Sequence, residues 1–144
     1  MRMLDRTGFT YSDLSVGMSE EYIKTITDND IVSFAEVSGD TNPMHLDDDF
    51  ASETLFRSRI AHGMLTASLI STIIGTLLPG PGCIYLGQNL KFLRPVRIGD
   101  AVLARVVIEA LIPEKKRVAL RTTCAVNDKL VLDGDALVMV PERA

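Results

Sequence analysis

Charged side chains are missing from one long stretch of this chain, and several other features are scarce. No Asp, Glu, Lys or Arg occurs from residue 60 through residue 90. No basic run is longer than Lys115-Lys116-Arg117 and the net charge is -4, which argues against nucleic acid as a partner. Residues 1–17 hold no apolar block, so we expect no secretory signal and a cytoplasmic location.

Cysteine is also rare, with only two residues in the chain. Cys83 and Cys124 lack the spacing of a metal site, so we expect reduced, structural thiols. We find no repeat, low-complexity tract or linker, and we expect no metal and no cofactor. A chain of 144 residues with 47% hydrophobic content can bury one full core. These features predict a single domain over residues 1–144, with its motif-bearing core at about 17–141.

The charge-free stretch predicts a long helix over residues 63–78, closed by the Pro-Gly-Pro-Gly of residues 79–82. Its length would be ~24 Å at about 1.5 Å per residue. Apolar residues lie almost all the way around its axis, so we expect it to be surrounded by other elements. It is too short and too rich in Ser, Thr and Gly for a membrane span, and we expect no membrane partner.

Apolar residues alternate with others in four downstream runs, which are residues 84–92, 102–112, 118–126 and 130–140. A period of two predicts antiparallel strands with one face on a core. A first strand is expected near residues 20–26. Thr27 then caps a short helix through Ser38, with Ile31, Phe34 and Ala35 on its inner face. The pattern predicts an α+β fold in which a curved antiparallel sheet wraps around one buried helix.

The most informative motif is Ser38-Gly39-Asp40-Thr41-Asn42-Pro43-Met44-His45. Pro43 fixes its own φ and disfavours helix at Asn42, so Asp40 and His45 flank a bend that can turn both side chains toward one point. A carboxylate and an imidazole that converge on one water suit proton transfer at pH 7. A purely structural alternative remains open, because Asp and Asn before a turn often bond their own backbone.

This motif, together with Ile60-Ala61-His62-Gly63-Met64-Leu65, resembles the MaoC-like R-specific enoyl-CoA hydratase and dehydratase family, which has a hot-dog fold. The strand at residues 82–92 is also similar to the short hydratases of that family. The resemblance covers nearly the whole chain. It implies hydration of a trans-2-enoyl thioester to the R-3-hydroxyacyl thioester, by a homodimer or a dimer of dimers.

By this resemblance Asp40 and His45 are the catalytic pair, and the backbone N–H of Gly63 is the oxyanion donor. The residues alone leave open which member of the pair moves which proton, although Asp40 is the natural base at pH 7. Gly63 suits its task because N–H groups at the start of a helix lack partners and favour negative charge. It also lacks a Cβ, which lets a carbonyl approach the backbone.

Three further residues are candidates for substrate binding. Asn42 is expected to hold the loop or the water. His62 is more often a helix-cap or packing residue than a catalyst. Ser71 could line the acyl path or bond the thioester, but a Ser commonly bonds a carbonyl of its own helix.

The phosphates of CoA require cations, and five candidates are available: Arg57, Arg59, Lys91, Arg94 and Arg97. Each is equally well explained as a solvated surface charge. The substrate could be a thioester of CoA or of an acyl-carrier protein, in which case the chain would be a 3-hydroxyacyl-carrier-protein dehydratase.

Two other classes are possible on this fold. A thioesterase typically carries its acid on the central helix, whereas no carboxylate occurs here between His62 and Leu90. A non-catalytic acyl-binding module would not need both Asp40 and His45.

Overall fold

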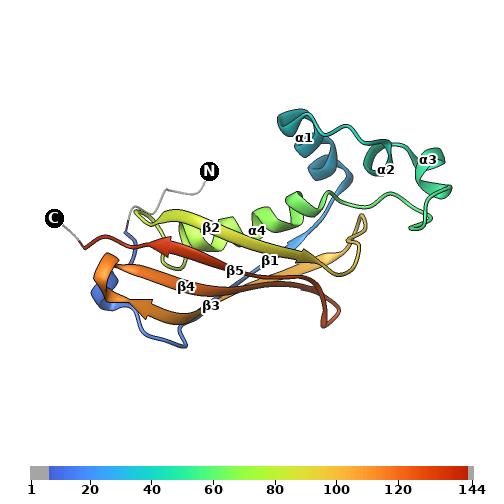
Figure 1. The fold of residues 1–144 in the computed structure, drawn as a ribbon. Coiled ribbons are helices and arrows are strands. Elements are labelled where there is room, and N and C mark those ends of the chain that lie inside the picture. Colours follow the sequence, from blue (N-terminus) through green and yellow to red (C-terminus); the bar gives the residue numbers. More distant parts are fainter. Residues whose placement is uncertain (1–6, 143–144) are drawn as a thin grey trace.

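The computed structural model describes residues 7–142 and is built on one antiparallel sheet (Figure 1). Residues 1–6, within the segment expected to lack a secretory signal, lie outside the described residues. The strands run in the order β1-β3-β4-β5-β2. They are β1 Ser19–Thr25, β2 Ile84–Phe92, β3 Ala101–Ile112, β4 Arg117–Val126 and β5 Lys129–Met139. The helices are α1 Asp28–Ser38, α2 Pro43–Leu46, α3 Asp48–Ser52 and α4 Gly63–Thr76, with 3-10 turns η1 Tyr11–Asp13 and η2 Pro113–Lys115.

Every strand begins and ends within one residue of its predicted position. The alternation is visible in β4, where Val118, Leu120 and Cys124 are fully buried on the face toward the core. The α+β prediction of a sheet around a helix is confirmed, because α4 runs along one face of the sheet (Figure 1). Side chains of α4, β3, β4 and β5 form one core cluster.

Helix α4 ends two residues earlier than predicted, where the N–H groups of Leu77 and Leu78 both bond the Ile73 carbonyl. The expectation that it is surrounded on every side is wrong for this chain by itself. Met64, Ser68 and Ser71 are exposed, because one sheet covers only one side of a helix. Across residues 7–142, none of the helices is long and apolar enough to cross a membrane.

Helix α1 begins as expected at the Thr27 cap. The Thr27 hydroxyl accepts from the Asp30 N–H at 3.1 Å, and the Asp30 carboxylate accepts from the Thr27 N–H at 2.9 Å. This backbone bond is the main reason that the pKa of Asp30 is lowered. On the inner face Ile31 and Ala35 are buried, and Gly39 ends the helix in the left-handed conformation with φ 81°.

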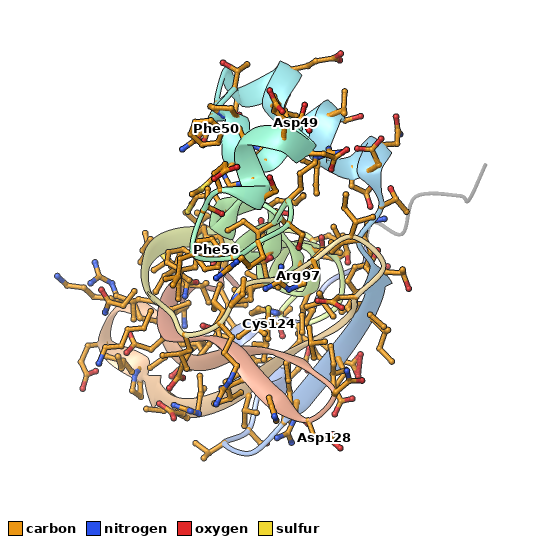
Figure 2. All side chains as sticks on the ribbon, turned by 90° about the vertical axis from the view of Figure 1, so that its right-hand side faces the viewer. Asp49, Phe50, Phe56, Arg97, Cys124 and Asp128 are labelled. Carbon is orange, nitrogen blue, oxygen red and sulfur yellow. The ribbon has the colours of Figure 1, made fainter. Side chains whose placement is uncertain are left out.

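Helices α1 to α3 form an overhang (residues 28–52) that extends beyond one end of the sheet (Figure 1). Figure 2 views the molecule from that end and shows Asp49 and Phe50 at the outer part of the overhang. The segment that follows the overhang returns to the sheet, where Ile60 bridges to Arg97. The overhang therefore carries the Asp40–His45 motif to the end of the sheet at which α4 begins.

Candidate active site

The loop between α1 and α2 is organised by its own short-range hydrogen bonds. The carboxylate of Asp40 accepts from the Asn42 N–H at 3.2 Å, and the Asn42 side chain accepts from the Met44 N–H at 3.1 Å. Asn42 is therefore the N-cap of α2, and Pro43 occupies the first turn. Asp40 and Asn42 thus both bond nearby backbone N–H groups, as the purely structural alternative for this motif expects. The predicted bend exists, and Asn42 holds the loop.

His45 is 7% exposed and is fixed by three contacts. Its Nδ1–H donates to the Ile60 carbonyl at 2.8 Å, and its backbone N–H donates to the Asn42 carbonyl at 3.0 Å. Arg59 Nε donates to the His45 carbonyl at 2.6 Å. Because the ring proton lies on Nδ1, the Nε2 atom of neutral His45 carries a lone pair and can accept a proton.

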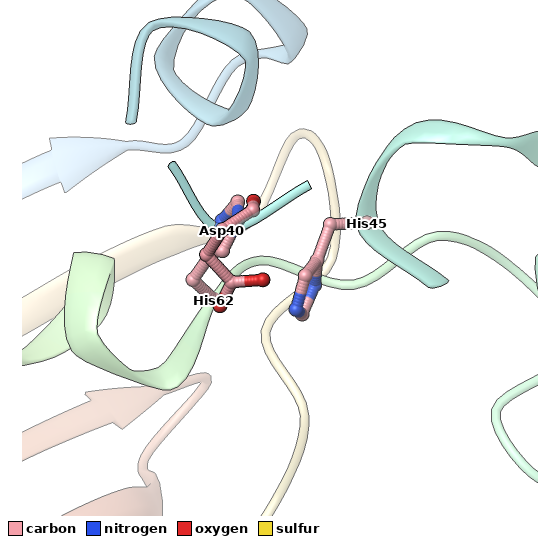
Figure 3. Close-up of side chains that lie close together, drawn as sticks. All are labelled: Asp40, His45 and His62. Carbon is pink, nitrogen blue, oxygen red and sulfur yellow. The ribbon is translucent and has the colours of Figure 1, made fainter. Parts of the chain in front are cut away.

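The structure brings Asp40, His45 and His62 together, with one potential ligand atom from each lying within 4.8 Å of the others. Figure 3 shows the carboxylate of Asp40 turned toward the imidazole of His45. Two acceptors at this separation leave room for one water that bonds both at ~2.8 Å. Asp40 and His45 are therefore close enough to share one water.

These three residues are also the types that ligate metals, but the ring geometry is poor for a shared ion. The imidazoles of His45 and His62 are stacked, with centroids 3.9 Å apart and planes at 28°. A metal ion lies on the nitrogen lone pair, in the plane of each ligating ring. Two stacked rings cannot both point their lone pairs at one ion without turning.

Burial is the main cause that lowers the pKa of His45 from its ordinary value of 6.5. The His62 ring lowers this pKa further, whereas the Ile60 carbonyl and the nearby Asp40 carboxylate raise it. His45 is consequently neutral at pH 7, with Nε2 free to accept a proton.

A cleft of about 440 Å³ opens beside His45 and the start of α4. Its lining is mostly apolar and comprises His45, Phe56, Ile60, Ala61, Gly63, Met64, Thr66, Phe92, Leu93, Arg94, Pro95, Val96, Val131 and Leu132. Of the sequence-predicted site residues, His45 and Gly63 line it. Asp40, which is exposed, does not line it, and neither do Asn42, His62 and Ser71.

Gly63 is the first residue of α4, and its N–H has no hydrogen-bond partner within residues 7–142. This N–H lies at the positive end of α4, which packs on the sheet along one side. A Cβ at this position would come within 2.6 Å of Phe92 Cε1, so only glycine fits without movement of the Phe92 ring. A residue with an unpartnered amide therefore lines the cleft that His45 also lines.

Three of the five candidate cations donate to backbone carbonyls, and one of the three is Arg94, whose Nη1 donates to the Leu130 carbonyl at 2.7 Å. Arg59 is bonded to the His45 carbonyl and to Asp28 at 2.5 Å. Arg97 bonds the Phe56 carbonyl and the Ser58 hydroxyl, at the junction seen in Figure 2. Arg94 is exposed and lines the cleft. Arg57 and Lys91 are exposed elsewhere on the surface.

Sequence reasoning missed two residues that shape the site. Arg59 supports the backbone of His45 from 14 positions away, and nothing in its neighbourhood marks this role. Phe92 covers Gly63, although its place at the end of an alternating run indicated only a core-facing strand residue. The packing of His62 on His45 had a weak signal, because these are the only two histidines in the chain.

An antiparallel sheet that packs on one long helix defines a hot-dog protein, and here an acid and an imidazole lie near the start of that helix. Residues 15–130 match the MaoC like domain. The chain is 54% identical to an (R)-specific enoyl-CoA hydratase of Rhodospirillum rubrum, over 92% of each chain. It is 53% identical to a 3-hydroxybutyryl-CoA dehydratase of Methylorubrum extorquens, over 92% of this chain and 85% of that protein.

A solved structure is also similar, namely the unliganded R-hydratase PhaJ1 of Pseudomonas aeruginosa. It superposes with a TM-score of 0.89 at 47% identity, covering 94% of this chain and 88% of that one. The chain belongs to the MaoC-like dehydratase family.

Proposed function

We propose that this protein catalyses the R-specific hydration of trans-2-enoyl-CoA to (R)-3-hydroxyacyl-CoA, and the reverse dehydration. The observation that carries the proposal is that Asp40 and His45 offer side-chain atoms within 4.8 Å of one another, and that His45 and Gly63 line one cleft. Family membership supports it, and the two curated relatives are named for CoA substrates. Such an enzyme is a hydro-lyase.

In the proposed reaction one water lies between the Asp40 carboxylate and His45 Nε2. Both atoms accept hydrogen bonds while His45 is neutral, so the water donates to both and turns a lone pair toward C3 of the substrate. The new O–C3 bond forms as one water proton passes to the pair. The electrons of the C2=C3 bond move into the thioester, which becomes an enolate.

The enolate then takes a proton at C2 from the same pair, so oxygen and hydrogen add from the same side. The pair ends the cycle with the protons it began with. We propose that the Gly63 N–H holds the enolate oxygen meanwhile, at the positive end of α4. One such donor is worth on the order of ~3 kcal/mol in other enzymes.

The cleft fits an acyl thioester because its lining is mostly apolar and includes a few polar side chains. We propose that Arg94 contacts the phosphates of CoA, since it alone of the five candidate cations lines the cleft, while its Nη1 donates to the Leu130 carbonyl at 2.7 Å. Asn42 acts through the loop. Direct roles for His62 and Ser71 in substrate binding stay predictions, and Ser71 lies on the exposed side of α4.

We also propose a homodimer that pairs through β2, and the dimer of dimers remains a prediction. Strand β2 is an edge of the sheet, and Ile84, Leu86 and Phe92 are exposed on it. A second copy would cover these side chains and the open face of α4. A monomer by light scattering at micromolar concentration would contradict this proposal.

We propose that each chain is a single domain. One core cluster contains buried residues of β3, β4 and β5, and side chains of β1 and β2 pack against it. A cytoplasmic location is proposed as well, and the free thiols of Cys83 and Cys124 support a reducing compartment. A role in fatty acid metabolism follows from the proposed substrate.

The experiment is to add crotonyl-CoA to the purified protein and follow the loss of the ultraviolet absorbance of the conjugated thioester. Chiral analysis of the product should find (R)-3-hydroxybutyryl-CoA. No decay with short or medium enoyl-CoA would reject the proposal and favour a carrier-linked dehydratase or a binding module. Formation of free CoA would instead indicate a thioesterase.

A further inference from the structure

His62 is buried beside the proposed catalytic pair but does not line the cleft. It is 2% exposed and stands directly before Gly63 as the N-cap of α4, although its side chain makes no capping bond. Its ring stacks on His45 with centroids 3.9 Å apart, and Phe34 of α1 packs against it at 4.8 Å. Its Nε2–H donates to the backbone carbonyl of Asp40 at 3.0 Å.

One atom of His62 has no structural use. Its Nδ1 is buried and has no hydrogen-bond partner within residues 7–142. A buried polar atom without a partner lowers stability, so a residue selected only for packing would be apolar. Phenylalanine has a similar shape and could stack equally well on His45 and Phe34. Packing therefore does not explain why this position is a histidine.

The Nε2–H is the part of the side chain that phenylalanine lacks. Asp40 belongs to an exposed loop that begins at the left-handed Gly39, and its own N–H bonds only the nearby Ser38 hydroxyl. The bond from His62 joins the backbone of this acid to the first turn of a core helix. The same residue also braces the plane of the His45 ring.

We propose that His62 is a positioning residue for the hydration reaction: its Nε2–H holds the backbone of Asp40 while its ring holds His45. This inference rests on the proposed function. It requires the neutral rings to be opposite tautomers, His45 with its proton on Nδ1 and His62 with its proton on Nε2. Each proton is fixed by a backbone carbonyl, at Ile60 and at Asp40.

Two substitutions separate positioning from packing. His62→Phe keeps the ring and removes the donor. His62→Gln loses the ring but places an amide N–H close to where Nε2–H lies. With crotonyl-CoA we expect kcat of His62→Phe to fall at least ~10-fold while KM stays within about threefold, because small misplacements of reacting groups act on turnover. His62→Gln should recover part of the lost kcat.

Thermal melting supplies the readout that a structural role would not produce. His62→Phe removes the unpartnered Nδ1, and the carbonyl of Asp40, an exposed loop residue, can bond water instead, so Tm should be unchanged or higher. A lower Tm in His62→Phe, with no recovery of kcat in His62→Gln, would reduce His62 to a packing residue. So would a kcat of His62→Phe within twofold of the wild type.

Nitrogen-15 NMR of the imidazoles tests the same inference without any turnover. His62→Phe leaves His45 as the one histidine in the chain, so the two rings of the wild type can be assigned by difference. A wild-type His62 that carries its proton on Nδ1 would overturn the proposal. If the tautomers are as stated but wild-type protein does not hydrate enoyl-CoA, the proposed function fails and the arrangement of the rings stands.

Discussion

Replacing Asp40 by Asn tests the proposed mechanism most directly, because it removes a charge with little change of shape. The amide oxygen of Asn can still accept from the Asn42 N–H, which Asp40 does at 3.2 Å. The loop should therefore keep its bend, and Tm should stay close to that of the wild type. What disappears is a proton acceptor and a negative charge within 4.8 Å of the other members of the site.

The charge alone accounts for a measurable part of the effect. When His45 takes a proton during turnover, a carboxylate within 4.8 Å attracts it by at least ~3.5 kcal/mol at an effective dielectric constant of about 20. Asp40 is exposed, so solvent screening reduces this to about 1.7 kcal/mol at a dielectric constant of ~40. At about 1.36 kcal/mol per tenfold in rate, this is a ~20-fold loss.

Loss of the acceptor itself adds to the loss of charge, so the total fall in kcat should be at least ~10²-fold. The assay is the decay of crotonyl-CoA absorbance under saturating substrate. Glu36→Gln is the matched control, since it removes one negative charge from the exposed face of α1 and should leave kcat unchanged. Asp40→Asn turnover within threefold of the wild type would remove Asp40 from the mechanism.

Three further predictions follow from the same geometry. His45→Gln should lower kcat at least ~10²-fold without a change in oligomeric state by light scattering, and wild-type turnover would exclude His45 as a proton carrier. Gly63→Ala should raise KM and lower kcat because its Cβ would lie 2.6 Å from Phe92 Cε1, and Gly63→Ala/Phe92→Ala should restore KM if that contact is the cause. The pKa of His45 is lowered in the folded state, so the unfolded chain binds the proton more readily. The free energy of unfolding, measured in urea, should therefore fall as pH drops below 6.5. In His45→Gln this fall should be less steep.

Local signals explain why the strands and the bend could be predicted from the sequence. Alternation with a period of two identifies a strand wherever one face is buried, as in β3 and β4. Thr27 with Asp30 marks the start of α1 by a mechanism that spans only four residues. Asn42 and Pro43 act over a similarly short distance. Each of these predictions depends on groups that are neighbours in the chain.

What depends on distant packing could not be predicted in the same way. Ser71 lies eight residues beyond Gly63, which puts it ~12 Å along the helix axis. Whether it faces the cleft or solvent depends on which side of α4 meets the sheet, and the structure places it on the exposed side. The position of β2 at the edge of the sheet could not be predicted either, because edge strands and central strands show the same alternation of apolar residues.

The support of the site is concentrated in the short segment that leads into α4. Arg59 bonds the His45 carbonyl, and the Ile60 carbonyl fixes the His45 ring. His62 bonds the Asp40 carbonyl, and Gly63 presents its free N–H. Residues 59–63, which lead into α4, thus hold or supply every group of the proposed reaction. In this way Asp40, although it is on an exposed loop, can keep a fixed distance to the proposed oxyanion donor Gly63. Both are attached to the same rigid element, the start of α4.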